Sequence, residues 1–384
     1  MRAEDARRTC LISAAALCGS AWLWGGDSLA GPALSSTLLL WIALGQSAPD
    51  RLLVATAYYL TGCWPIVGAV LGYWGAHHVA AAVGAWLGSS LLLASPWALP
   101  PRRGGLFAAL MLTALPPLGV IGWLSPLTAA GALFPAAGWT GILCLAVMSM
   151  VLPGALHGNT AARWLLATVF CLALCTNLVA TLTPSPQVPS GWVGLQTRIR
   201  PGDGDVLTSI QNNQAVIDAG LRQGAGARVL VLPEAILPDW YAGTRSQFAA
   251  VVQPAQTWLL GAQIEKRDAV VLARASNAQP APLAESAGLL FGGDWQPWNP
   301  RSLHPAWWQQ VFELDGRRVW AAICVEQVQP WTWLEALAQR PDVILAQSNV
   351  WWAGRTREAP EIQGASTKAW ARLMDLPVLS ALNR

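Results

Sequence analysis

The stretch "VWAAICVEQ" (319–327) joins an apolar run to two chemically active side chains. The run reads as a buried strand that ends at Cys324, and Glu326 follows two residues later. A second buried strand lies in "ARVLVLPEA" (227–235) and is followed at once by Glu234. Open α/β sheets place their chemistry at the carboxyl ends of their strands. We therefore expect a functional site to include the ends of these two strands.

The surrounding sequence, from residue 184 to residue 384, alternates between strand and helix patterns. Period-2 or continuous apolar runs predict strands, and apolar residues at helical spacing predict helices. Asp315-Gly316 is a strong signal for a two-residue hairpin turn. The alternation predicts an α/β domain with strands near 191–199, 227–232, 258–263, 268–275, 342–349 and 377–383, a hairpin over 309–326, and helices near 210–223, 331–340 and 366–376.

The first 183 residues have a different composition. They contain seven arginines, no lysine and four acidic residues, whereas residues 184–384 contain 17 basic and 17 acidic residues. A helix needs about 20 apolar residues to cross the hydrocarbon of a bilayer. The sequence predicts an α-helical membrane domain over 1–183, with about seven spans near 9–25, 30–48, 52–73, 76–98, 104–124, 127–152 and 163–183.

The loop arginines predict the orientation of this domain. All seven fall before the first expected span or in alternate loops, which is typical of the cytoplasmic side. With seven spans, the N-terminus is cytoplasmic and the domain from residue 184 onward lies outside, on the periplasmic face of a bacterial inner membrane. A cleaved signal peptide over the first 25 residues is the alternative.

Cys324 is the only cysteine of the second half of the chain. An exported compartment is oxidising, so a single cysteine there is either a reactive thiol or a small apolar residue of the core. The other six lie in or beside the expected spans: Cys10, Cys18, Cys63, Cys144, Cys171 and Cys175.

Three short motifs occur in order along the second half: "VLVLPEAILP", "AAICVEQ" and "ILAQSNVWWAG". Because these motifs occur in this order, the chain resembles the nitrilase (carbon–nitrogen hydrolase) superfamily. With its apolar first half it also resembles the membrane-bound apolipoprotein N-acyltransferases and the TraB conjugal transfer proteins. The resemblance implies a membrane bundle followed by an αββα sandwich.

The resemblance also implies site residues. Glu234 matches the general base, and Cys324 matches the nucleophile that takes an acyl group as a thioester. Glu326 matches a carboxylate that the superfamily often carries after the cysteine. A solvated charge at a strand end is the alternative interpretation of Glu326.

The superfamily also uses a lysine to stabilise the tetrahedral intermediate, and here the match fails. Lys266 is the only lysine between Glu234 and Cys324, and it precedes its strand instead of following it. The expected region offers Arg301 and His304. The lysine's role is therefore unassigned, with Lys266 and Arg301 as weak candidates, and both an active and an inactive protein remain open.

The resemblance implies an amidohydrolase or N-acyltransferase near a bilayer, with a membrane lipid or a lipoprotein-like acyl substrate and a link to the conjugation machinery. A catalytically inactive scaffold of that machinery is the alternative. We expect no cofactor, and no metal because His77-His78 lacks a third ligand. No nucleic-acid contact is expected, because no basic stripe accompanies the net charge of +3. The Trp-rich loop 292–308 suits a water–lipid interface.

Overall fold

The chain forms two compact units in the computed structural model, which describes residues 3–25, 28–200, 206–237, 240–353 and 356–384. The helical unit comprises Met1–Ser185, Val328–Trp331 and Arg355–Asp375. The sheet unit comprises Pro186–Gln327, Thr332–Gly354 and Leu376–Arg384. The first boundary lies close to the expected one at 183/184, but two later segments group with the helical unit, so the units are not consecutive along the chain.

Short and medium helices make up the helical unit, several of them ending at prolines or glycines. Its α-helices are α1 (Ala3–Ser20), α2 (Ala30–Ser35), α3 (Thr37–Leu44), α4 (Ala48–Cys63), α5 (Pro65–Trp74), α6 (Val79–Ala94), α7 (Gly105–Ala114), α8 (Ala129–Leu133), α9 (Trp139–Leu156), α10 (Thr160–Leu182) and α14 (Glu358–Met374). Single 3-10 turns lie at Ala21–Leu23, Ser95–Ala98, Arg102–Gly104, Leu118–Val120 and Pro126–Thr128.

Three helices are long and apolar enough to cross a membrane: Val79–Ala98, Trp139–Leu156 and Thr160–Leu182. Helices α4 and α5 pass the same test together but bend by 46° at their junction, so they could form a fourth span. Among the described residues the number is therefore three or four, not the seven that the sequence pattern predicts.

Proline accounts for part of the difference, because it removes a helical hydrogen bond and clashes with the preceding turn. The apolar run 104–124 contains α7, which ends at Ala114, just before Pro116 and Pro117. The run 127–152 is interrupted between α8 and α9, where Pro135 lies. Apolar composition therefore overestimated the length of continuous helix.

Buried aromatic side chains and close helix contacts hold the helical unit together. Tyr58 donates from its hydroxyl to the Leu124 carbonyl (2.9 Å) and accepts from the Trp22 indole (3.0 Å). Helix α14 packs on α8 so closely that a Cβ at Gly131 would lie 1.7 Å from the Ala369 carbonyl oxygen. The late segment 355–375 is thus an integral part of this unit.

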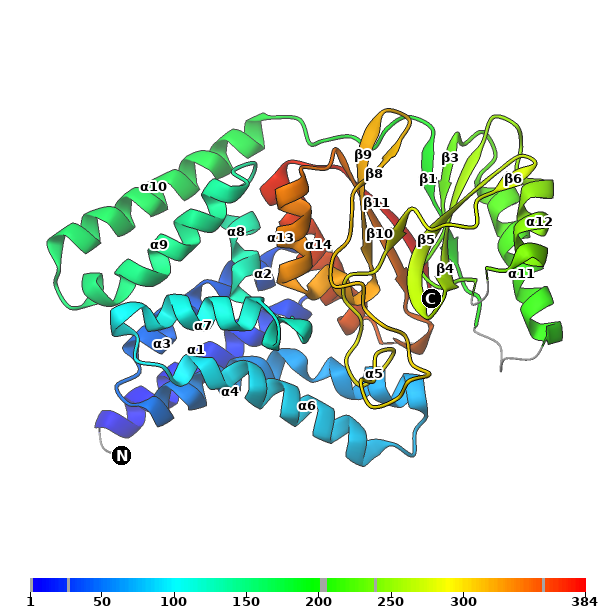
Figure 1. Cartoon of the computed structure of the whole chain (residues 1–384). Helices are drawn as coiled ribbons and strands as arrows, with labels where there is room; N and C mark the ends of the chain where they lie inside the picture. The colour runs from blue at the N-terminus through cyan, green and yellow to red at the C-terminus, as the bar shows by residue number, and fades with distance from the viewer. Residues whose placement is uncertain (1–2, 26–27, 201–205, 238–239, 354–355) are drawn as a thin grey trace. The chain divides into compact units, whose positions relative to one another are not determined.

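Two mixed sheets form the sheet unit, in agreement with the expected α/β class (Figure 1). Sheet A has the order β1-β3-β4-β5-β6, with β7 also paired to β5, and sheet B has the order β2-β11-β10-β9-β8. The strands are β1 (Trp192–Gly194), β2 (Gln196–Thr197), β3 (Val229–Val231), β4 (Thr257–Ile264), β5 (Arg267–Arg274), β6 (Asn277–Ala278), β7 (Ala284–Glu285), β8 (Phe312–Leu314), β9 (Arg317–Ile323), β10 (Val343–Asn349) and β11 (Val378–Asn383). The expected hairpin turn at Asp315-Gly316 joins β8 to β9 and is confirmed.

The two sheets face each other across a shared apolar core. Side chains of sheet A, such as Val231 and Leu259, pack in one cluster with Ile323 and Leu345 of sheet B. Since successive strand residues point to opposite faces, the alternate residues of sheet A form a second core on its outer face.

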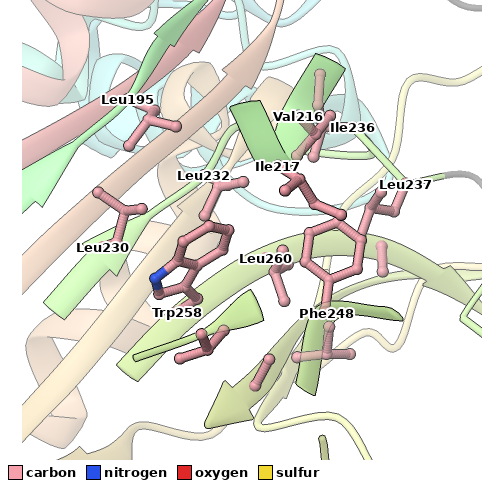
Figure 2. Packing of buried hydrophobic residues seen from close by; sticks show 14 of the residues in the cluster. Leu195, Val216, Ile217, Leu230, Leu232, Ile236, Leu237, Phe248, Trp258 and Leu260 are labelled. Carbon is pink, nitrogen blue, oxygen red and sulfur yellow. The ribbon is translucent and has the colours of Figure 1, made fainter. Parts of the chain in front are cut away.

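Helices α11 (Val206–Gln223) and α12 (Ala242–Val251) cover that outer face. Figure 2 shows this second core, in which Phe248 of α12 meets Trp258 of β4 at a ring-centroid distance of 6.3 Å. Beside sheet B lies α13 (Pro330–Gln339), whose Gln339 carbonyl accepts a hydrogen bond from Arg318 of β9.

Candidate functional site

Glu234 follows the end of β3 by three residues and is buried. Its backbone lies against Gly261 of β4, where an added Cβ would come within 2.3 Å of the Pro233 carbonyl oxygen and 2.5 Å of the Glu234 Cα. Sheet B fixes the same segment. The Asn349 N–H donates to Oε2 of Glu234 (3.0 Å), and the Gln347 amide donates to the Leu232 carbonyl (2.6 Å).

Cys324 follows β9 directly and opens a 3-10 turn (Cys324–Val328). Its φ of 46° lies in the left-handed region, which non-glycine residues seldom adopt and which often marks functional positions. The thiol is hydrogen-bonded to the Glu234 carboxyl group, and the residue is only partly buried. The structure thus brings together the two residues that the sequence places at the ends of separate strands.

The surroundings of this pair are acidic. Burial raises the pKa of Glu234 well above its usual value, and the charge of Asp268 raises it further. Burial also raises the pKa of the Cys324 thiol, and the charges of Glu234 and Asp294 raise it further. A proton is therefore held firmly between the thiol and the carboxyl group, and the thiolate forms only when Glu234 accepts that proton.

Asp268 and Asp294 are two members of this site that sequence reasoning missed. Asp268 is the second residue of β5 and is buried, and its pKa is raised to about 7 by burial and by the charge of Asp294. In the sequence it reads as an ordinary polar strand start. Asp294 lies in the Trp-rich loop, where no pattern indicates that a carboxylate acts electrostatically on the thiol. Only the pairing of β4 with β5 and the path of the loop reveal them.

Glu326 is fully buried, so the interpretation as a solvated strand-end charge is wrong. Its carboxylate accepts from the N–H groups of Ala287 (2.6 Å), Gly288 (3.3 Å) and Ile323 (2.8 Å), and from the Gln309 amide (3.3 Å). Burial raises its pKa to about 8, against the opposing effect of these hydrogen bonds. Glu326 therefore joins the segment before the Trp-rich loop to the end of the cysteine strand.

Lys266 and Arg301 are the two weak candidates for the lysine role that the resemblance implies. Both are exposed. The Lys266 ammonium donates to the Pro300 carbonyl (2.7 Å), and Arg301 is held through its backbone N–H by Asn299 (3.0 Å).

A metal is not indicated at this site. Within the described ranges, no group of three or more His, Cys, Asp or Glu residues could hold a metal ion. The His77 and His78 rings lie against each other, with centroids 4.0 Å apart. None of the seven cysteines, all of which the structure describes, is in a disulfide.

The Trp-rich loop carries an ordered aromatic cluster. Phe291 meets Trp295 and Trp298 edge to face, with centroid distances of 5.5 and 5.7 Å, and Trp295 meets Trp307 at 5.1 Å. Trp298, Trp307 and Trp308 remain exposed. The loop is thus stabilised by its own side chains while presenting apolar surface.

Comparison with known proteins identifies relatives over nearly the full length. The chain is 30% identical to the conjugal transfer protein TraB of Agrobacterium fabrum, over 99% of this chain and 94% of that protein. The chain belongs to the TraB family. It is also 27% identical to the probable conjugal transfer protein TraB of Sinorhizobium fredii, over 72% of this chain and 71% of that protein. No family model matches the sequence.

Proposed function

We propose that this TraB-family protein is a membrane-anchored thiol enzyme of plasmid conjugal transfer, a carbon–nitrogen hydrolase or an N-acyltransferase. In this proposal the sheet unit is a nitrilase-like αββα domain on the periplasmic face of the inner membrane. The conjugal context comes from the names of its relatives. The chemistry is argued from the pair Glu234 and Cys324.

The reaction starts when the Cys324 thiol attacks the carbonyl carbon of an acyl donor and passes its proton to Glu234. The tetrahedral intermediate then expels the donor's amine or alcohol, which takes that proton from Glu234, and a thioester remains on Cys324. Water or an acceptor amine attacks the thioester next. Glu234 takes the attacking group's proton and returns it to the departing sulfur, which restores the starting state.

The hydrogen bond between Glu234 and Cys324 is the observation that carries this proposal. A thiol needs a base within hydrogen-bond reach to act as a nucleophile near neutral pH. The left-handed backbone of Cys324 supports the same conclusion, since nucleophiles on strained strand-to-helix turns are exposed for attack. Without a protein cation to stabilise the oxyanion, the rate should be lower by roughly 100- to 1000-fold than with one.

A catalytically inactive scaffold is the second candidate, and the acidic surroundings favour it. Asp268, Asp294 and Glu234 all raise the pKa of the thiol, so its resting state is protonated and weakly nucleophilic. In that case the buried carboxyl groups have no catalytic task, and the contribution to conjugation comes from surfaces of the protein.

Intact mass of the membrane-purified protein, beside Cys324→Ala and Glu234→Gln, distinguishes the two. The enzyme predicts an acyl-sized mass increment on the wild type that is absent in Cys324→Ala. Because fast hydrolysis would hide a thioester, plasmid transfer frequency is measured in the same strains. Unmodified wild-type protein together with full transfer by both variants contradicts the enzyme and supports the scaffold.

A further inference from the structure

Asp268 is a buried carboxylate with an incomplete set of partners. The residue is 3% exposed, and Oδ1 has no hydrogen-bond partner among the described residues. Gln263, which faces it across the β4–β5 pair, donates a hydrogen bond to the carboxyl group. Buried carboxylate oxygens are normally satisfied, and an open one calls for an explanation such as an absent ligand.

Strand register places this open oxygen on the same face as the Cys324–Glu234 pair. Val270 and Leu272 of β5 face the core between the sheets, so Asp268, two residues before Val270, points the same way. On β4, Gly261 and Gln263 lie on that face, and Gly261 is the residue that Glu234 contacts. Asp268 therefore lies beyond the Glu234 segment, at the same end of the sheets.

Two further carboxylates act on the Glu234–Cys324 pair. Asp268 and Asp294 both act electrostatically on Glu234 and on Cys324. Concentrating carboxylates in a poorly solvated region is costly unless a cation compensates them. The Lys266 ammonium is bonded to the Pro300 carbonyl. An organic cation needs only a single charge-assisted hydrogen bond, which the open Oδ1 of Asp268 can accept.

We infer that Asp268, with Asp294, forms a subsite for an organic cation, an ammonium or guanidinium group carried by the molecule that binds beside Cys324. Asp268 accepts a charge-assisted hydrogen bond on Oδ1, and Asp294 adds favourable charge. The bound cation then lies close to the sulfur and stabilises negative charge there. It replaces in part the positive charge that the superfamily lysine would provide.

The statement that the cation belongs to a substrate or an acceptor rests on the proposed enzymatic function. The statement that the subsite binds a cation does not. The subsite can therefore be tested through the thiol without turnover. Methylguanidinium is a suitable probe because it stays charged over the whole pH range of thiol titration, and N-methylurea is its neutral counterpart of similar shape.

The experiment measures the rate at which iodoacetamide modifies Cys324 at pH 8 in the detergent-purified full chain, with peptide mass spectrometry separating Cys324 from the other cysteines. An opposite charge nearby typically shifts a pKa by 1–3 units. Millimolar methylguanidinium should therefore raise the Cys324 rate saturably, by about tenfold or more, at constant ionic strength. N-methylurea should leave the rate unchanged.

Asp268→Asn should abolish the response, while Asp315→Asn, which alters an exposed carboxylate in the β8–β9 turn, should retain it. Methylguanidinium could instead slow the alkylation of Cys324 because the bound cation covers the sulfur. Slowing that saturates, that N-methylurea does not cause and that is lost in Asp268→Asn also supports the subsite. The inference is overturned by any of three results: methylguanidinium and N-methylurea change the rate equally, neither changes it, or the response to methylguanidinium survives in Asp268→Asn. Each outcome is independent of whether a thioester ever forms.

Discussion

Asp50 in the helical unit and Asp268 in the sheet unit are both buried carboxylates, in residues that are 5% and 3% exposed. Asp50 is fully partnered. It accepts from Arg8 (2.7 Å) and from the Ser47 N–H (3.2 Å), and Ser47 caps helix α4 in return. Asp268 keeps an open oxygen and lies in a field of like charge. Two carboxylates with similar burial thus differ in their partners, and this difference is why we infer a ligand-binding role for Asp268 and not for Asp50.

Glu326→Ala should produce the largest effect on stability. Glu326 is buried like Asp268 but fully partnered like Asp50, and its removal leaves three backbone N–H groups and an amide without their acceptor. The cost should be about 3–5 kcal/mol, seen as a thermal midpoint lower by roughly 10 °C in tryptophan fluorescence. Glu313→Ala, at an exposed position of β8, is the control. A midpoint shift no larger than the control's contradicts a structural role for Glu326.

Gly261→Ala should rank second, at about 1–3 kcal/mol, because the new Cβ overpacks against the Glu234 segment. The same displacement should disturb the hydrogen bond from Glu234 to Cys324 and change the alkylation rate of that cysteine. Gly364→Ala in α14, where a Cβ has open space, should be neutral or slightly stabilising. Equal stability and equal Cys324 reactivity in the two alanine variants would show that the close approach at Gly261 does not position Glu234.

Asp50→Ala tests the fully partnered side of the comparison. It removes the reciprocal half of the capping box, in which Asp50 accepts from the Ser47 N–H, and the ion pair with the partly exposed Arg8, so the loss should be about 1–2 kcal/mol. The reactivity of Cys324 should stay as in the wild type. The thermal midpoint in detergent and the alkylation rate check both statements, and altered Cys324 reactivity would contradict the separation of structural from functional carboxylates.

Asp268→Asn should have the smallest effect on stability and should depend on pH. The folded-state pKa of Asp268, about 7, exceeds that of an unfolded aspartate, about 3.9. Between these values the folded protein binds more protons than the unfolded chain, so wild-type stability falls as pH rises from about 4 to 7. Asp268→Asn removes this contribution and should be at least as stable as the wild type at pH 8. An identical pH dependence of the midpoint in both proteins argues against a strained carboxylate.

The sequence predicted the fold correctly where hydrophobic residues repeat with a strand or helix period and where a residue pair specifies a turn. The α/β alternation, the Asp315-Gly316 hairpin and the strand ends that carry Glu234 and Cys324 all follow from local residue choice. The number of helices long and apolar enough to cross a membrane did not follow, because apolar composition does not reveal breaks such as those near Pro116 and Pro135.

The composition of the site followed only in part. Neighbouring residues cannot show that Asp268 acts on the charge of the thiol, since this depends on the β4–β5 register and on the packing of the two sheets. The burial of Glu326 likewise depends on N–H groups almost 40 residues away, at Ala287 and Gly288. Long-range pairing, which local patterns do not encode, decides both.

The most direct test of the account is the pH profile of Cys324 alkylation in the wild type and in Glu234→Gln. Because the Glu234 charge and hydrogen bond raise the pKa of the thiol, the wild-type midpoint should lie above that of an ordinary cysteine. It should move down in Glu234→Gln. Superimposable profiles would show that Glu234 and Cys324 share no proton, and would contradict the catalytic pair on which the proposed function rests.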